Sequence, residues 1–377
     1  MEGSLTLRGK SKIWYLRYDE RTVDGKRRQR RVRIGRMSKT EAEARKRDLL
    51  RALDDGGWTE DPKGVTVAKY FETWLATQQN YLAANTHERY ESILRVHVTP
   101  LIGTLRLTKV QPEHIRQVYR VAAEKGLSGR TCLHIHRVLH TAFNHAVLVD
   151  RLLKENPLER VKAPRPSEFE VKAMNPEQVR LLLEVAKGTR LEVPVALAAV
   201  TGLRRGELLA LRWANVDLER GSLFVAEALE QTRTSGVRFK APKSKSSRRF
   251  IPLALESVEI LRAHREAQNG AKKRAPFCVD NDLVFCNPDG QPWPPDTFTV
   301  QFAQLAKNVG MKGFRFHDLR HAFASLTLAD GRPIKEVQLL MGHSTANTTL
   351  SVYARAVEGL GRDAVNSLSR SLLSPQG

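Results

Sequence analysis

The sequence predicts a multidomain α+β protein with three parts: a small N-terminal β-sheet plus one helix, an all-α bundle, and a mixed, mainly α C-terminal domain with a small antiparallel sheet. Three observations support this prediction. The length of 377 residues allows two or three domains. The apolar pattern alternates near the N-terminus and takes helical spacing after residue 65. A proline-rich stretch without apolar periodicity, residues 162–176, indicates a linker before the last domain.

The composition narrows the class of protein. Apolar residues make up 41% of the chain, enough to build packed cores, so a wholly disordered chain is excluded. Three cysteines cannot form a disulfide scaffold, and no apolar run approaches the roughly 20 residues of a transmembrane helix. The N-terminal residues lack the apolar core of a secretion signal. We therefore expect a soluble, cytoplasmic protein.

Positive charge is spread along the whole chain. The formal net charge is +21, and residues 1–64, 65–165 and 166–377 share this excess equally. If the positive charge came from a basic tail on an otherwise neutral enzyme, only one of these segments would carry the excess. A polyanion that touches all three segments is the simplest partner, and nucleic acid is the obvious one. No convincing basic amphipathic helix favours a membrane surface instead.

Residues 1–57 are predicted to form a three-stranded sheet packed on one helix. Apolar and polar residues alternate over 11–36, and Asp24-Gly25 is a hairpin signal. A helix is expected over 40–54, with Ser38 as its N-cap and two glycines after its end.

The predicted N-terminal sheet is rich in basic and aromatic residues. Between Lys10 and Arg36 there are 11 basic and 3 acidic residues. A sheet with one basic face can lie in the major groove of DNA, as β-ribbon proteins do. We therefore expect DNA contacts from Trp14, Tyr15, Arg17, Lys26, Arg27, Arg28, Arg30, Arg31 and Arg33.

Residues 65–161 have helical spacing and predict four helices, a compact all-α domain. The first helix is expected over 67–79, with Thr66 as its N-cap. The second is expected over 89–97, ended by Pro100 and capped by Asn85 or Thr86.

The last two helices of this bundle have clear start signals. Gln111-Pro112 begins a helix that runs to Lys125, where Gly126 closes it. Ser128 begins a long helix that runs through Arg151.

The third predicted domain covers residues 172–377. Asn175-Pro176 begins its first helix, with proline at the first helical position. Short strands are expected from Ser222 to Pro252, with helices on both sides of them in the sequence.

No residue pattern indicates a metal or a cofactor. His136 and His140 share one helix face at i,i+4 spacing, but no third ligand is evident. Cys278 and Cys286 lack the second pair that a zinc ribbon needs. We expect surface or DNA-facing histidines on this helix, no bound metal and no cofactor.

Four segments late in the chain resemble a known family in order and spacing. They are TGLRRGELLAL at 201–211, APKSKSSRRFIPL at 241–253, HDLRHAFAS at 317–325 and LMGHSTANTTLSVYAR at 340–355. Together they closely resemble the tyrosine recombinases, also called phage-type integrases. Upstream, residues 10–55 resemble the arm-type DNA-binding domain of that family, and residues 65–160 resemble its helical core-binding domain.

The resemblance implies a set of catalytic residues. Arg204 matches the first catalytic arginine of the family, and Glu207 matches the acidic residue one helical turn later that supports it. His317 and Arg320 match the His-x-x-Arg pair. The remaining matches are His343, at a position held by His or Trp, and Tyr353, the nucleophile.

The lysine of the family's strand–strand turn is best matched by Lys243. Lys240 and Lys245 flank it in the same loop. Apart from this catalytic lysine, we expect DNA phosphate contacts from Lys240, Lys245, Arg248 and Arg249.

These residue types suit metal-independent cleavage of a phosphodiester. Two arginine forks can bind the non-bridging oxygens of the pentacoordinate state and stay charged at any working pH. The tyrosine phenol needs help to lose its proton, for which His317 is the candidate base, whereas His343 is expected to donate to the phosphate. A lysine with a lowered pKa suits the leaving 5′-oxygen.

The implied function is site-specific recombination of a prophage or other mobile element through a covalent 3′-phosphotyrosine. The expected partners are double-stranded DNA at two classes of site, further copies of the chain in a tetramer joined by the C-terminal tail, and accessory DNA-bending or directionality proteins. The protein would then be associated with the nucleoid.

Two alternatives come from other classes of protein. The first is strand relaxation by a type IB topoisomerase-like enzyme, which would not need the N-terminal DNA-binding domain. The second is a catalytically idle DNA-binding regulator, which would not need the complete set of catalytic residue types.

Overall fold

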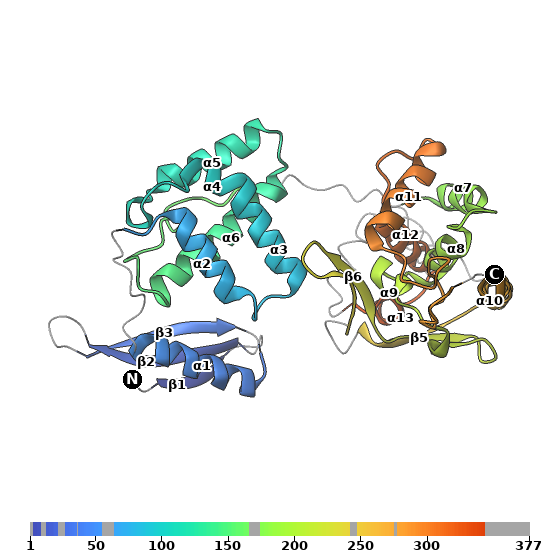
Figure 1. Cartoon of the computed structure of the whole chain (residues 1–377), viewed down its shortest axis with the longest axis horizontal. Helices are drawn as coiled ribbons and strands as arrows, with labels where there is room; N and C mark the ends of the chain where they lie inside the picture. Colours follow the sequence, from blue (N-terminus) through green and yellow to red (C-terminus); the bar gives the residue numbers. More distant parts are fainter. Residues whose placement is uncertain are drawn as a thin grey trace, which may run out of the picture. The chain divides into compact units, whose positions relative to one another are not determined.

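The computed structural model of the chain describes residues 3–8, 13–21, 27–35, 37–54, 64–165, 174–241, 247–274 and 277–343. It consists of two compact units, Met1–Phe169 and Glu170–Gly377, which combine helices with small antiparallel sheets in a multidomain α+β architecture (Figure 1). Several predicted residues lie outside the described residues: Lys26, Lys243, Lys245, Tyr353 and the C-terminal tail.

The first unit begins with a three-stranded antiparallel sheet in the order β1-β2-β3, and one face of it is covered by helix α1 (Figure 1). The bounds are β1 (Gly3–Arg8), β2 (Ile13–Arg21), β3 (Arg27–Gly35) and α1 (Lys39–Asp54). The sheet has three strands, and β1 lies before the alternating segment 11–36 of the sequence.

Side-chain alternation decides which face of this sheet meets the helix. Leu16, Tyr18 and Val32 are buried, and Leu49 and Leu50 of α1 pack against them. Because side chains alternate along a strand, the residues between them lie on the opposite face.

The start of α1 confirms the predicted cap. The Ser38 hydroxyl accepts from the backbone N–H of Glu41 at 3.2 Å, and the Glu41 carboxylate accepts from the Ser38 N–H at 2.8 Å. This reciprocal pair satisfies two backbone donors that the helix start leaves free. The hydrogen bonds also hold the pKa of Glu41 below its usual value.

The rest of the first unit is a helical bundle packed around Tyr70, Phe71, Trp74, Leu139 and Phe143. Its helices are α2 (Val67–Gln78), α3 (Ala84–Ile93), the π-helix η1 (Leu94–Val98), α4 (Thr99–Ile102), the 3-10 helix η2 (Leu107–Lys109), α5 (Pro112–Glu124) and α6 (Gly129–Leu148).

The predicted caps at Thr66 and Ser128 are confirmed, since each hydroxyl accepts a backbone N–H of the first turn at 3.3 Å. The predicted start at Gln111 is also confirmed. The long helix α6 ends at Leu148 rather than at Arg151, which has a positive φ of 55°.

The predicted second helix is wrong at both ends. It begins at Ala84 without a side-chain cap, so neither Asn85 nor Thr86 is its N-cap. Pro100 does not end it but lies in the first turn of α4, after the π-helical turn. Proline fits there because the first turn of a helix leaves its N–H groups without helical partners.

The second unit begins with α7 (Pro176–Ala186), whose N-cap Asn175 accepts from the Gln178 N–H at 2.8 Å as predicted. The other helices are α8 (Glu192–Thr201), α9 (Arg205–Leu209), η3 (Trp213–Asn215), α10 (Leu255–Arg274), α11 (Pro295–Asn308), α12 (Phe316–Ala329) and α13 (Ile334–Met341).

Two small antiparallel sheets complete the second unit. One has the order β4-β5-β8, and the other is the hairpin β6-β7. The bounds are β4 (Val216–Asp217), β5 (Ser222–Val225), β6 (Ala228–Thr232), β7 (Gly236–Lys240) and β8 (Arg249–Pro252). The predicted strand stretch is thus confirmed, with one short strand before it.

The helices offer no candidate for a membrane span: within the described ranges, none is both long and apolar enough.

Candidate active site

The predicted site residues of the second unit come from segments far apart in the sequence. Arg204 directly precedes α9, Arg320 lies on α12, and His343 follows the end of α13. Hydrogen bonds join Arg204 and Arg320 to carbonyls at the end of α13. The structure therefore brings Arg204, Arg320 and His343 together around the C-terminal end of α13.

Two glycines make this convergence possible. Gly202 ends α8 with φ +61°, and Gly342 ends α13 with φ +60°, the left-handed conformation that favours glycine. A Cβ on Gly202 would also lie 2.5 Å from the ring of Phe323. These turns direct the chain abruptly toward Arg204 in one case and toward His343 in the other.

Arg204 is fixed from two sides. Its Nη1 donates to Glu207 at 2.7 Å, and its Nη2 donates to the carbonyl of Gly342 at 3.3 Å. Glu207 also accepts the backbone N–H of Arg204 at 3.0 Å. The side chain of Arg204 keeps 37% of its surface exposed, so it can still reach a ligand.

Arg320 is the more deeply buried of the two predicted phosphate clamps, with 2% of its surface exposed. Its Nη1 donates to the carbonyl of Gly202 at 2.5 Å, and its Nη2 donates to the carbonyl of Met341. Burial and the charge of Arg204 lower the pKa of Arg320 to about 9, so it remains charged at neutral pH. A guanidinium with spare N–H groups therefore lies beside Arg204.

Glu207 holds two guanidinium groups at once. Besides Arg204, it accepts from Nη1 and Nη2 of Arg249 at 3.3 and 3.0 Å. Burial by itself would raise the pKa of Glu207, but the hydrogen bonds and charges of the two arginines outweigh burial and lower it. The carboxylate is therefore ionised, as a support for Arg204 requires.

The structure corrects the expected DNA contact at Arg249. This side chain is buried inside the unit, whereas its neighbours Arg248 and Phe250 are exposed. Its signal in the sequence is alternation along β8, because Arg249 shares a strand face with buried Ile251. Arg248, in contrast, has the exposure that a phosphate contact needs.

His317 and His343 lie at the edge of the arginine cluster. His317 is exposed at one side, but desolvation by the surrounding protein, the neighbouring His321 and the charge of Arg320 lower its pKa. Burial and the charges of Arg320 and Arg204 lower the pKa of His343 to about 4. Both imidazoles are therefore neutral at pH 7, and a neutral imidazole can accept a proton or donate a hydrogen bond.

The neighbouring His321 packs against His317 rather than adding a ligand to the cluster. The two rings meet edge to face with centroids 4.8 Å apart. Among the residues that the structure describes, the buried Nδ1 of His321 has no hydrogen-bond partner.

The lysine hairpin is partly described. Glu230 of β6 is buried and pairs with Arg238 at 2.7 Å and with Lys240. Lys240 is therefore held at the base of the hairpin by a carboxylate, and its predicted DNA contact would have to compete with this pair. Lys243 and Lys245 follow in the part of the loop that lies outside the described residues.

The N-terminal sheet separates its predicted DNA contacts between two faces. Tyr15, Arg17, Arg31 and Arg33 alternate with the buried residues, and the Arg31 guanidinium lies 5.3 Å from the Tyr15 ring centroid.

Trp14 is on the helix side, where its indole N–H donates to the carbonyl of Met37 at 3.0 Å. This hydrogen bond joins Trp14 to the segment before α1. The side chains of Arg27, Arg28 and Arg30 lie outside the description.

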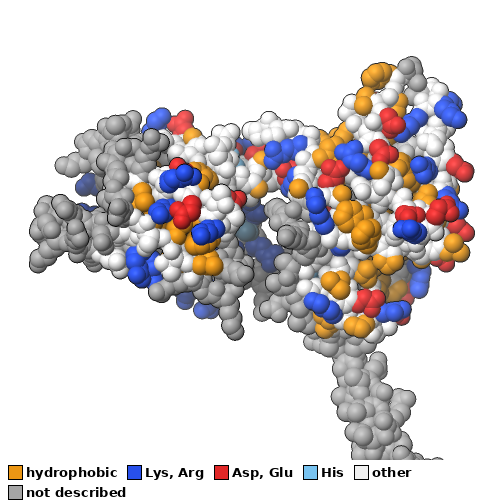
Figure 2. Space-filling model, turned by 90° about the horizontal axis from the view of Figure 1, so that it is seen from below, with side chains coloured by type: hydrophobic (Ala, Val, Ile, Leu, Met, Phe, Trp, Pro, Cys, Tyr) orange, Lys and Arg blue, Asp and Glu red, His pale blue; other side chains and the backbone are white. Residues whose placement is uncertain are grey.

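Basic side chains are not confined to these clusters. On the face drawn in Figure 2, Lys and Arg side chains occur on both units, with Asp and Glu side chains among them. This agrees with the even spread of charge in the sequence.

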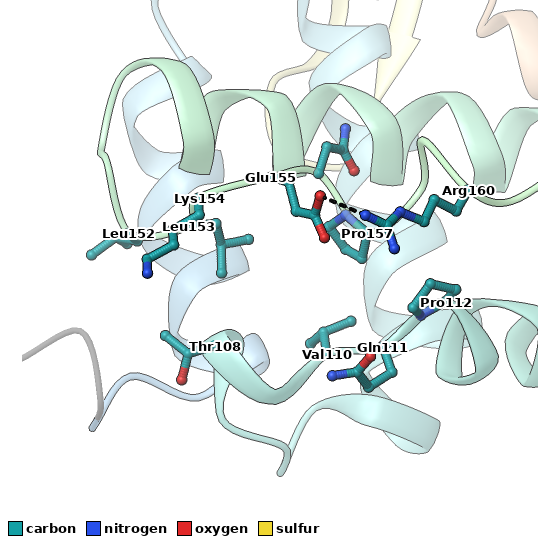
Figure 3. Close-up of a pocket in the computed structure, with 11 residues that line it drawn as sticks. Thr108, Val110, Gln111, Pro112, Leu152, Leu153, Lys154, Glu155, Pro157 and Arg160 are labelled. Carbon is teal, nitrogen blue, oxygen red and sulfur yellow. Dashed lines mark hydrogen bonds and ion pairs between the residues drawn. The ribbon is translucent and has the colours of Figure 1, made fainter.

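A well-formed hollow in the helical bundle does not coincide with the site. It encloses about 430 Å³ between the loop before α5 and the segment after α6, where Arg160 donates to Glu155 at 3.2 Å (Figure 3). None of the predicted site residues lines it. At the arginine cluster, Arg204 keeps 37% of its side-chain surface exposed, so a large polyanion could reach it.

The histidines of α6 have protein partners. His136 shares a hydrogen bond of 2.7 Å with the Tyr119 hydroxyl, and His140 one of 3.2 Å with Asn144. Within the described part of the chain, no group of three His, Cys, Asp or Glu residues could hold a metal ion.

Comparison with known families places both units. The model of the phage integrase family matches residues 172–358, and the model of the phage integrase N-terminal SAM-like domain matches residues 66–120. An integrase of Streptomyces ambofaciens is 30% identical over 336 residues, covering 85% of this chain and 84% of the relative. A "tyrosine recombinase XerC-like" protein of Caldanaerobacter subterraneus is 28% identical, covering 88% of this chain and 90% of the relative.

Solved structures share the fold. The Tn1549 transposon integrase in complex with a circular intermediate DNA has a TM-score of 0.70 and 23% identity, covering 81% of this chain and all of that one. A lambda integrase tetramer bound to a Holliday junction has a TM-score of 0.57 and 17% identity, covering 93% and 94% of the two chains.

Proposed function

Because this chain belongs to the phage integrase family of tyrosine recombinases, it is a site-specific DNA recombinase that cleaves and rejoins DNA, and we propose which of its residues perform the reaction. The proposed catalytic residues are Arg204, Lys243, His317, Arg320, His343 and Tyr353, with Glu207 in support. The observation that carries the proposal is the meeting of Arg204 and Arg320, from separate helices, at the end of α13 beside His343. Topoisomerase-like relaxation and an idle regulator are not favoured.

The two arginines would bind the non-bridging oxygens of the scissile phosphate. Cleavage passes through a pentacoordinate state in which these oxygens carry extra negative charge, and prealigned guanidinium groups stabilise that charge without reorganising. Arg320 is buried and Arg204 half-exposed, so the phosphate would approach from the side of Arg204. Neutral His343 would donate a hydrogen bond to the same phosphate.

The reaction itself is an exchange of one phosphate ester for another. The Tyr353 oxygen attacks phosphorus while its proton passes to neutral His317. The bond from phosphorus to the 5′-oxygen breaks, and Lys243 gives that oxygen a proton. The products are a 3′-phosphotyrosine and a free 5′-hydroxyl, which can attack again to rejoin the strands without an external energy source.

The hairpin supports Lys243 over Lys240 as the general acid. Lys240 is paired with buried Glu230, and this contact holds its ammonium group at the base of the hairpin. Lys243 is three residues further along the sequence, outside the described residues.

We assign DNA binding to three domains. Residues 1–57 would be an arm-type domain that contacts a second class of site through Tyr15, Arg17, Arg31 and Arg33, on the sheet face that α1 leaves uncovered. Residues 65–161 would bind the core site together with the catalytic domain, residues 172–377. Arg248 and the lysines of the loop would add phosphate contacts.

The working assembly would be a tetramer on two duplexes, joined by the tail beyond Tyr353. The structural neighbour solved as a tetramer on a Holliday junction supports this proposal. The substrate would be the ends of a mobile element, and the place of action the cytoplasm, at the nucleoid.

The test is covalent capture on a nicked suicide substrate. Tyr353→Phe keeps the ring but removes the nucleophilic oxygen, so the protein–DNA adduct should disappear while DNA binding persists. The matched control is Tyr81→Phe, which removes the hydroxyl of an exposed tyrosine in the other unit and should leave the adduct intact. Adduct formation by Tyr353→Phe would exclude Tyr353 as the nucleophile.

A chelator arm of the same experiment tests metal independence. Because the proposed charge stabilisation comes from guanidinium groups, the adduct should form equally well in EDTA. Loss of the adduct in EDTA with recovery on adding Mg²⁺ would contradict the mechanism.

A further inference from the structure

Arg249 is a buried cation that the proposed chemistry does not use. It begins β8, and 8% of its surface is exposed, although the residues before and after it are exposed. Burying a guanidinium is unfavourable unless its N–H groups find acceptors. The hydrogen-bond acceptors of the Arg249 guanidinium therefore indicate the role of this buried side chain.

Arg249 bridges two parts of the active site. Its Nη1 and Nη2 donate to the two oxygens of Glu207, and its Nε donates to the carbonyl of Leu340 on α13 at 2.5 Å. Its Nη1 also donates to the carbonyl of Ser247 at 3.1 Å. A single planar group thus joins the carboxylate that orients Arg204 to the helix that ends just before His343.

Three arginines donate hydrogen bonds to three successive carbonyls at the end of α13. The carbonyls of Leu340, Met341 and Gly342 accept in turn from Arg249, Arg320 and Arg204. Carbonyls in the last turn of a helix lack helical partners and carry partial negative charge, which cations stabilise. Two of these arginines are the proposed phosphate clamps, and the third is Arg249.

We propose that Arg249 is a positioning residue for DNA cleavage, which fixes the distance between Arg204 and His343 by tying Glu207 to the end of α13. This inference rests on the proposed roles of Arg204 and His343. Arg249 does not touch the DNA itself, because its guanidinium is enclosed by Glu207, β8 and α13. It acts by holding the phosphate-binding groups in one geometry before DNA arrives.

The test compares Arg249→Lys with Arg262→Lys, a control at an arginine of α10 that pairs with Glu219 at 2.8 Å and has no proposed role in catalysis or DNA binding. Lysine keeps the charge but cannot bind both Glu207 oxygens and the Leu340 carbonyl at once, because one ammonium replaces a planar fork. In Arg249→Lys, cleavage of saturating suicide substrate should slow by about 100-fold, with DNA affinity unchanged. In Arg262→Lys, cleavage should match the unaltered protein, because a lysine can keep an exposed ion pair with Glu219.

A second substrate separates positioning from simple support of the fold. A methylphosphonate at the scissile position replaces one charged non-bridging oxygen with a methyl group, so cleavage depends less on the clamp. The defect of Arg249→Lys should shrink on this substrate, in parallel with the defect of Arg204→Ala. If Arg249→Lys slows cleavage of the phosphodiester and of the methylphosphonate by the same factor, the proposal is overturned. A general loss of structure would slow cleavage of both substrates equally.

A double variant guards against misfolding. Should Arg249→Lys unfold at a lower temperature, Glu207→Gln combined with Arg249→Met removes both buried charges and restores packing. This variant should also cleave slowly and show the same partial recovery on methylphosphonate. If this double variant cleaves as fast as the unaltered protein, the proposed role of Arg249 is overturned. The proposed function still stands in that case, because the unaltered protein forms its adduct. Failure of the unaltered protein to form any adduct would instead refute the proposed function.

Discussion

Arginines of the N-terminal sheet and arginines around α13 have opposite environments. Arg31 and Arg33 are exposed on an open sheet face, whereas Arg249 and Arg320 are less than a tenth exposed and directed at named acceptors. The same side chain is thus used as a surface charge in one region and as a fixed fork in the other. The environment, rather than the residue type, decides which property matters.

The difference has measurable consequences. A surface charge contributes to DNA binding through counterion release, so its effect depends on salt and lysine can replace it. A buried fork contributes through directed hydrogen bonds, so its effect depends little on salt and lysine cannot replace it. The predictions below test this contrast, from the largest expected effect to the smallest.

Arg320→Lys should produce the largest effect. Lysine cannot donate to both Gly202 and Met341 and still face a phosphate, so cleavage of bound suicide substrate should fall by roughly 1,000-fold. The matched surface change, Arg31→Lys, should leave cleavage and distal-site binding nearly unchanged. Single-turnover cleavage rates at saturating protein check both, and similar losses in the two variants would break the contrast.

Lys243→Ala should slow cleavage by about 100-fold, because the leaving oxygen loses its acid. A substrate with sulfur at the 5′-bridging position has a better leaving group, so it should restore the rate of this variant. Lys240→Ala, which loses a lysine already paired with Glu230, is the control and should show little defect and no selective rescue. Rescue of Lys240→Ala instead would move the acid to that residue.

Deletion of residues 1–57 should remove one DNA activity and spare the other. All the proposed catalytic residues lie beyond position 200, so core-site cleavage should persist while binding to the second class of site is lost. Footprinting of the full and shortened chains gives the answer. One contiguous protected region with the full chain, together with loss of core cleavage and stability on deletion, would mean that this segment only stabilises its neighbour.

Arg31→Ala and Arg33→Ala should act on the salt dependence of distal-site binding. Each lost phosphate contact should reduce the slope of log K against log salt by about 0.9, with little change in core cleavage. Binding titrations at several salt concentrations measure the slope. An unchanged slope in the double variant would remove the uncovered sheet face from the DNA interface.

The smallest expected effect is the pH dependence of stability. The pKa of His343 is lowered to about 4 by burial and by Arg320 and Arg204, below the value near 6.5 of an unfolded histidine. The unfolded chain therefore binds the proton first, and stability that is complete above pH 6.5 is lost as the pH falls toward 4. The loss should be of the order of 1–3 kcal/mol in denaturation of the DNA-free chain. His343→Gln should make the curve flatter, and an unchanged curve would contradict the lowered pKa.

Local signals predicted much of the fold. The caps at Ser38, Thr66, Ser128 and Asn175 were placed correctly because a cap is a contact within four residues of sequence. The bounds of the second helix, within residues 84–102, were predicted wrongly because they do not depend on such local contacts. There the helix continues through a π-helical turn whose apolar residues pack in the bundle core, and no side-chain cap marks its start.

The candidate site, too, could be predicted from the sequence only in part. The order and spacing of Arg204, His317, Arg320 and His343 are properties of the sequence, and so is the chemistry that those side chains offer. Arg249 was assigned from residue type alone, and the structure turns it toward the interior.

The sequence by itself determined the class of chemistry, the basic character and the caps of several helices, because these depend on residue type and short-range spacing. Only the tertiary structure decided which arginines are exposed and which are buried with acceptors around α13. Alternation along a strand puts Arg249 and Ile251 on one face, but it does not say which face is buried. That face became the inside because α13 and Glu207 pack against it and supply the acceptors that a buried guanidinium requires.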